Sequence, residues 1–154
     1  MPTLEGGLRV DAEDDDDWLL LSGIAHDAVS CDEKLAERLG ALIGEEELAE
    51  DWREFIIPEL DEAFHSDVSH VAAIVSAARL EVAGGKGPLW ITRDDAPRWY
   101  SALNQARLAI EEIHRFGPGE RVRPEKLPPD VRSAFLRSQF YCALQSLLLD
   151  LLMR

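Results

Sequence analysis

Two Glu-x-x-His motifs come nearest to a recognisable metal-binding pattern in this chain. Glu62 precedes His65 by three positions, and Glu111 precedes His114 in the same way. Two such motifs on facing helices would supply half of the ligands of a di-iron centre. At about 100° of rotation per residue, however, Glu62 and His65 fall roughly 160° and 100° from the apolar seam of their helix, and Glu111 and His114 roughly 120° and 60° from theirs. Both motifs are therefore interpreted as solvated side chains, and no metal site is predicted.

Other catalytic signatures fail on spacing. The run Asp14 to Asp17 lacks the alternating oxygen ligands, central Gly and final Glu of a calcium-binding EF-hand loop. Lys86 is followed by Gly87 and Pro88, whereas a phosphate-binding loop needs Ser or Thr after its Lys. No Ser or Cys lies in a Gly-x-Ser-x-Gly nucleophile elbow. The sequence thus predicts no catalytic residue and no cofactor.

One polar stripe could still form a site. Tyr100, Asn104 and Arg107 follow each other at helical spacing and continue to Glu111 and His114, so they share a second face of one helix. One interpretation is structural, with Arg107 crossing to a carboxylate of the acidic half and Asn104 bonding a neighbouring loop. The other is a small-ligand or peptide groove, for which Tyr100, Asn104, Arg107 and Trp52 are the candidate residues.

The charge of the chain is unevenly distributed. The net charge is −14, and residues 1–70 contain 21 Asp or Glu against 4 Lys or Arg, whereas residues 71–154 contain 9 against 12. Binding to nucleic acid depends on Lys and Arg that neutralise phosphates, so direct nucleic-acid binding is not expected. We expect the acidic half, residues 11–70, to meet a basic surface on a protein partner.

Hydrophobic periodicity predicts an all-α fold, a compact bundle of five to six helices in a single domain spanning residues 1–154. Ser30 and Glu33 form a capping box, Pro58 suits the first position of a helix, and Asp94 suits an N-cap. A minimal two-strand element could pair Leu8–Val10 with Leu89–Ile91. The predicted helices cover residues 14–29, 31–43, 45–57 and 58–82, a fifth from Asp94 to the Gly117-Pro118 break, and 130–153.

The last predicted helix is unusually apolar. It is hydrophobic over most of its circumference from Phe135 to Leu152, so it belongs in the middle of the bundle or in an oligomer interface, and a homodimer through this helix is one interpretation. The chain shows no signal peptide and no apolar run long enough to span a bilayer, which favours the cytoplasm. Cys31 and Cys142 are expected to be reduced.

Several segments resemble a known family. They are Asp51-Trp52-Arg53-Glu54 with Pro58-Glu59-Leu60, the run from Trp99 to Leu108, and the apolar ending from Phe140 to Leu149. From about Trp18 to the C-terminus the chain resembles the bacterial domain-of-unknown-function family numbered 2017. Members are small acidic helical proteins with no established activity or cofactor, and some are encoded beside the adaptor of the Clp protease. The resemblance implies an uncharacterised protein with a regulatory or adaptor-like role.

Overall fold

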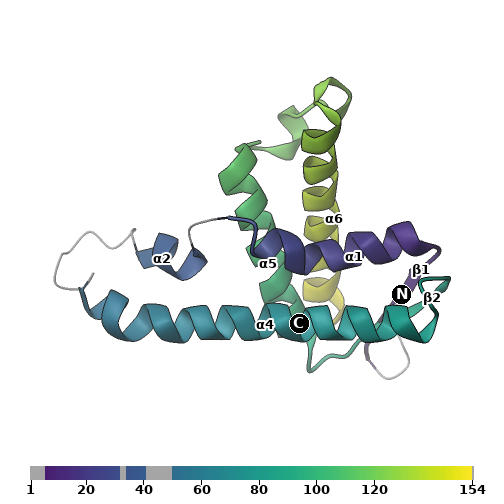
Figure 1. Ribbon diagram of the computed structural model, residues 1–154, viewed down its shortest axis with the longest axis horizontal. Helices are drawn as coiled ribbons and strands as arrows, with labels where there is room; N and C mark the ends of the chain where they lie inside the picture. Colours follow the sequence, from purple (N-terminus) through teal and green to yellow (C-terminus); the bar gives the residue numbers. More distant parts are fainter. Residues whose placement is uncertain (1–5, 32–33, 41–49, 154) are drawn as a thin grey trace.

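The chain folds mainly into helices, as predicted, in the computed structural model, which describes residues 6–31, 34–40 and 50–153. α1 and α4 contact each other and run side by side, while α5 and α6 cross them steeply (Figure 1). The elements are β1 (Leu8–Ala12), α1 (Asp15–Ala28), α2 (Leu35–Gly40), a π-helix (Trp52–Ile56), α4 (Ile57–Glu81), β2 (Gly87–Ile91), α5 (Ala96–His114), 3-10 turns at Gly119–Arg121 and Pro124–Lys126, and α6 (Pro129–Leu151).

The predicted two-strand element is confirmed. β1 and β2 pair antiparallel, with Leu8 opposite Ile91 and Val10 opposite Leu89, and the pairing extends to Ala12 opposite Gly87. Leu8, Leu89 and Ile91 point into the core, since alternate residues of a strand face the same side. The pair is too short to be stable alone and depends on the helices that it covers.

Carboxylates start α1, as the sequence indicates. The Asp14 side chain accepts a hydrogen bond from the Asp17 amide at 3.2 Å, and the Asp17 carboxylate accepts one from the Glu13 amide at 2.8 Å. These bonds satisfy backbone amides at the start of the helix. The negative charges also interact favourably with the positive N-terminal end of the helix dipole. The acidic run therefore has a structural role in starting α1.

Ser30 does not start the second helix. Its hydroxyl donates to the Asp27 carbonyl at 2.6 Å and so closes the end of α1, and α2 begins only at Leu35. Glu33, the predicted partner in the capping box, lies outside the described residues. The predicted helix over 31–43 is therefore confirmed only for Leu35–Gly40.

The predicted break before Pro58 is wrong. The predicted helix over 45–57 is described from Glu50 onward, and from there the helix continues through the π-helix into α4. Pro58 occupies the second position of α4 and withholds an amide hydrogen. A π-turn shifts the hydrogen-bond pattern from i→i+4 to i→i+5, which can absorb such a missing donor without ending the helix.

α5 begins one residue later than predicted. Its N-cap is Asp95, not Asp94, and the Asp95 carboxylate caps no amide because it lies 3.1 Å from Nε2 of His70 on α4. The Asp95 amide donates instead to Oγ1 of Thr92 at 3.1 Å. A contact between helices has thus replaced the local cap that the sequence predicted.

α5, and not α6, is the central helix. It contacts α1 and α4 on one side and α6 on the other. The expectation that the last helix lies in the middle of the bundle is therefore wrong. Local apolar content does not decide this, because the buried seam of α5 is rich in small residues that let neighbouring helices approach closely, namely Ala96, Ala102, Ala106 and Ala109.

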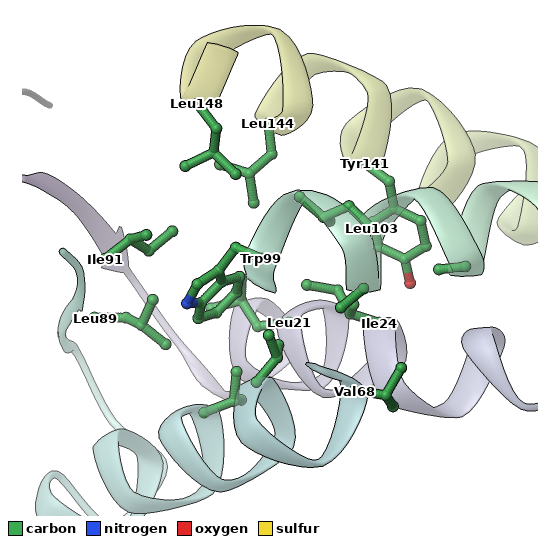
Figure 2. Packing of buried hydrophobic residues seen from close by; sticks show 14 of the residues in the cluster. Leu21, Ile24, Val68, Leu89, Ile91, Trp99, Leu103, Tyr141, Leu144 and Leu148 are labelled. Carbon is green, nitrogen blue, oxygen red and sulfur yellow. The ribbon is translucent and has the colours of Figure 1, made fainter. Parts of the chain in front are cut away.

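Large side chains from every layer meet in one core. Figure 2 shows Trp99 of α5 between Leu89 and Ile91 of β2 and Leu21 of α1, with Leu144 and Leu148 of α6 above it. Trp18 is also fully buried, and its indole nitrogen donates to the Gly85 carbonyl at 2.7 Å. That bond ties α1 to the loop after α4.

Candidate functional site

The polar stripe on α5 faces α6. The Nη1 atom of Arg107 donates to Oε1 of Gln145, and Nε2 of Gln145 donates to the Tyr100 carbonyl at 3.3 Å. The predicted bond from Arg107 to a carboxylate of the acidic half is wrong, because α6 covers this face of α5 and supplies the acceptor. Arg107 and Tyr100 are thus joined through a buried glutamine of the neighbouring helix.

The other stripe residues are not assembled with this pair. Asn104 is partly buried, and no described residue forms a hydrogen bond with its side chain. Trp52 lies in the π-helix before α4, and its side chain is outside the described part of the chain. Whether Tyr100, Asn104, Arg107 and Trp52 bind a ligand stays a prediction, since the contacts of Arg107 are also explained by packing of α5 on α6.

The two Glu-x-x-His motifs lie where the helical angles indicated. Glu62 and His65 are exposed, and Glu111 accepts a hydrogen bond from the Gly117 amide at 2.9 Å. His114 stacks on Phe116 with ring centroids 5.2 Å apart. Within residues 6–31, 34–40 and 50–153, no group of three or more His, Cys, Asp or Glu is arranged to hold a metal ion. Cys31 and Cys142 are both free thiols.

A buried polar cluster that sequence reasoning missed joins α1 to α6. Asp27 is only 3% exposed, and its carboxylate accepts hydrogen bonds from Nε and Nη2 of Arg137 at 2.8 and 3.0 Å. The hydroxyl of Tyr141 donates to the same carboxylate at 2.6 Å. Gly23 permits this approach, since a Cβ there would lie 3.0 Å from the Tyr141 hydroxyl. We call Asp27, Arg137 and Tyr141 the α1–α6 clamp.

The electrostatics of the clamp suit a structural role. Burial of the hydroxyl and its bond to Asp27 raise the pKa of Tyr141, so it stays a neutral donor. The hydrogen bond from Arg137 to Asp27 raises the pKa of that guanidinium further above its already high value. A carboxylate that accepts three such bonds is held in place by side chains of α6, and its buried charge has a cationic partner.

The sequence did carry a signal for the clamp. Asp27 continues the i+3 series of buried residues Trp18, Leu21 and Ile24, which puts a carboxylate on the buried side of α1. Arg137 and Tyr141 are four residues apart and so share a face of α6. A charged residue on a buried face needs a partner of opposite charge, and this rule would have pointed to an arginine elsewhere.

A cavity of about 350 Å³ is lined by residues from the end of α1 and from α2, α4 and α5. Its two strong cations are already paired: Nζ of Lys34 lies 3.2 Å from Asp61, and Nη2 of Arg38 lies 3.3 Å from Glu112. The positive charge of the cavity is therefore largely cancelled within the chain. The lining residues are Ala28, Val29, Cys31, Lys34, Leu35, Arg38, Asp61, Phe64, His65, Val68, Gln105 and Ala109.

The start of the long α4 helix combines negative charge with exposed apolar side chains. Four carboxylates, those of Glu50, Asp51, Glu54 and Glu59, are exposed there and form no ion pair with the described residues. Phe55 and Ile56 lie among them and are 60% and 39% exposed. We call residues 50–59 the acidic tip, and Figure 1 shows it at the end of α4 far from β2.

Fold and site together define a mainly helical protein whose buried polar groups hold its helices together and whose acidic surface carries exposed apolar residues. The chain belongs to the family described as a domain of unknown function (DUF2017), whose model matches residues 3–152. Comparison with curated proteins and with solved structures gave no match. In the described residues, no helix combines the length and apolar character that crossing a membrane requires.

Proposed function

We propose that this chain is a non-enzymatic interaction or regulatory protein whose acidic half binds a basic surface on a protein partner. The observation that carries the proposal is the acidic tip, where Phe55 and Ile56 are exposed among four carboxylates that form no ion pair with the described residues. Exposed apolar side chains that lie together and are rimmed by polar residues are typical of protein–protein contact sites. The proposed place of action is the cytoplasm.

The apolar side chains and the carboxylates of the acidic tip contribute differently to binding. Exposed aromatic and aliphatic residues supply binding energy when a partner desolvates them, and such residues dominate the centres of interfaces. The surrounding carboxylates attract a cationic partner, accelerate association and repel polyanions such as nucleic acid. We expect a partner segment in which Lys or Arg residues flank an apolar pocket.

A small-ligand or catalytic site at Tyr100, Asn104 and Arg107 has less support. Nη1 of Arg107 is held by Oε1 of Gln145, which is itself buried, so a ligand that took over this nitrogen would leave the Gln145 amide oxygen without this partner. Leaving that amide without a partner would cost on the order of 1–3 kcal/mol.

The test is affinity capture from lysate with two variants of the tip. The wild-type chain should retain a basic protein at about 0.05 M NaCl and release most of it at about 0.5 M, because salt screens exposed charges. Phe55→Ala should weaken capture at both salt concentrations, and replacing the four carboxylates with glutamine should weaken it mainly at low salt. All of these side chains are exposed, so the variants should fold normally.

The matched control is Glu120→Gln with Glu125→Gln, which removes exposed carboxylates from the connection between α5 and α6. It should capture the partner as well as the wild type does. A wild-type chain that captures nothing at either salt concentration would contradict the proposal, as would tip variants that bind like this control.

A further inference from the structure

α6 is covered by the rest of the chain on one side only. It packs mainly on α5 and the turn Pro124–Lys126, and more weakly on α1. Beside the covered side, the α6 stripe consists of Leu136, Phe140, Ala143, Leu147 and Leu151, which fall within an arc of roughly 80° at 100° per residue. Phe140 is partly buried against the core, and the other four are exposed. Leu136 and Leu147 are 51% and 47% exposed.

The stripe is nearly free of charge in a strongly acidic chain. No residue from Ser138 to Leu149 is charged, and Asp150 alone is charged between Arg137 and Arg154. The stripe belongs to residues 71–154, where basic residues slightly outnumber acidic ones, and it is separate from the acidic tip. It is therefore a surface where two copies of this acidic chain could meet with little electrostatic repulsion.

The two ends of the stripe have complementary shapes. A groove of about 370 Å³ lies near the start of α6, where Leu20 of α1 faces Pro129, Leu136 and Phe140 of α6. Arg132, Ser133 and Arg137 also line it, and the guanidinium of Arg137 is paired with Asp27. Toward the other end, Leu147 and Leu151 are exposed on the same side of the helix. The midpoint of Leu136 and Phe140 lies about 8 Å before Ala143, and that of Leu147 and Leu151 about 9 Å after it, at 1.5 Å per residue.

We propose that a second copy of this chain covers the α6 stripe, with the two α6 helices antiparallel and related by a two-fold axis at Ala143. Leu147 and Leu151 of each copy then enter the groove of the other beside Leu136 and Phe140. The near-equal spacing about Ala143 is what a two-fold interface requires, because the same patch must complement itself. The small side chain of Ala143 allows close approach at the axis. This dimer is independent of the proposed partner, and it would display two acidic tips.

Sedimentation of the full chain over a range of concentrations tests the association. The wild type should sediment as a dimer, and Leu147→Glu should raise the dissociation constant at least ~100-fold, since the substitution enters a two-fold interface twice. The control is Leu80→Glu on α4, which places the same charge at an exposed leucine away from the stripe and should leave the dimer intact. Circular dichroism of both variants verifies that they fold.

Disulfide trapping tests the geometry, in a chain whose own cysteines are replaced by serine. Ala143→Cys should cross-link to its symmetry mate under mild oxidation. Leu136→Cys should not, because the antiparallel arrangement puts its two copies about 21 Å apart along the helix, far beyond the reach of a disulfide. Leu149→Cys, exposed but on another face of α6, is the matched control and should not cross-link.

Each alternative has its own result. A wild-type chain that is monomeric at every concentration means that another molecule covers the stripe, and it overturns the proposal. Cross-linking of Leu136→Cys indicates a parallel pair, and cross-linking of Leu149→Cys indicates a different face; either overturns the two-fold geometry. Equal dissociation constants for Leu147→Glu and the wild type would also overturn the proposal, because Leu147 would then lie outside the interface.

Discussion

Replacing Asp27 with asparagine should destabilise the fold by about 2–3 kcal/mol. The substitution keeps the shape of the side chain but removes the charge that accepts two hydrogen bonds from Arg137 and one from Tyr141. Breaking a buried ion pair by removing one partner costs about 3–5 kcal/mol. The Arg137 side chain is 28% exposed, so water solvates part of its unpaired charge and the expected cost falls to the lower end of that range or below it.

A double-mutant cycle isolates the pair from other effects of the substitution. Asp27→Asn, Arg137→Gln and the double variant are unfolded in urea and followed by tryptophan fluorescence. The coupling energy should be about 1.5–3 kcal/mol, the range for hydrogen bonds to a charged group. The same cycle on Asp15 and Arg79, an exposed pair at 2.7 Å, is the matched control and should give less than about 1 kcal/mol.

Comparing the two cycles tests whether the coupling energy depends on more than the distance between the charged groups. The exposed control pair is as short as the bonds of the α1–α6 clamp, so the two cycles compare a buried pair joined by two hydrogen bonds with an exposed pair joined by one contact at a similar distance. A coupling energy below about 0.5 kcal/mol for Asp27 and Arg137, or one equal to that of the control pair, would refute the reasoning.

Two further predictions concern the contacts of α6. Since burial raises the pKa of Tyr141 above its ordinary value of 10.0, the folded state holds this proton while the unfolded state loses it. The free energy of unfolding should therefore fall above pH 10, and between pH 10 and 11 the wild type should lose about 1 kcal/mol more than Tyr141→Phe. If urea unfolding showed that both proteins lose the same free energy of unfolding between pH 10 and pH 11, the prediction would be contradicted.

The second prediction concerns the bond between Arg107 and Gln145. Arg107→Ala should destabilise the fold by about 1–3 kcal/mol. Adding Gln145→Ala should destabilise it little further, because both substitutions remove the same charge-assisted bond. An Arg107→Ala variant of wild-type stability would favour the ligand-site interpretation instead.

Periodicity and caps made much of the helical architecture predictable. The seam of Val68, Val71 and Val75 repeats at helical spacing, and α4 is the long helix that it indicates. Turn residues and short apolar runs indicated that Leu8–Val10 could pair with Leu89–Ile91, whereas the antiparallel register was decided by the structure. Helical periodicity depends on neighbours within a few residues, so the sequence carries it directly. Boundaries at Ser30, Pro58 and Asp94 were less predictable, since a tertiary hydrogen bond or a π-turn can replace a local cap.

The sequence by itself determined which faces of the helices are apolar and that negative charge gathers in residues 1–70. Only the tertiary structure decided which faces meet. It placed Arg107 against Gln145 and not against the acidic half, it made α5 the central helix, and it paired Asp27 with Arg137 across 110 residues. The physical reason is that helical periodicity records the direction of a side chain, whereas its partner depends on packing between elements that are distant in the chain.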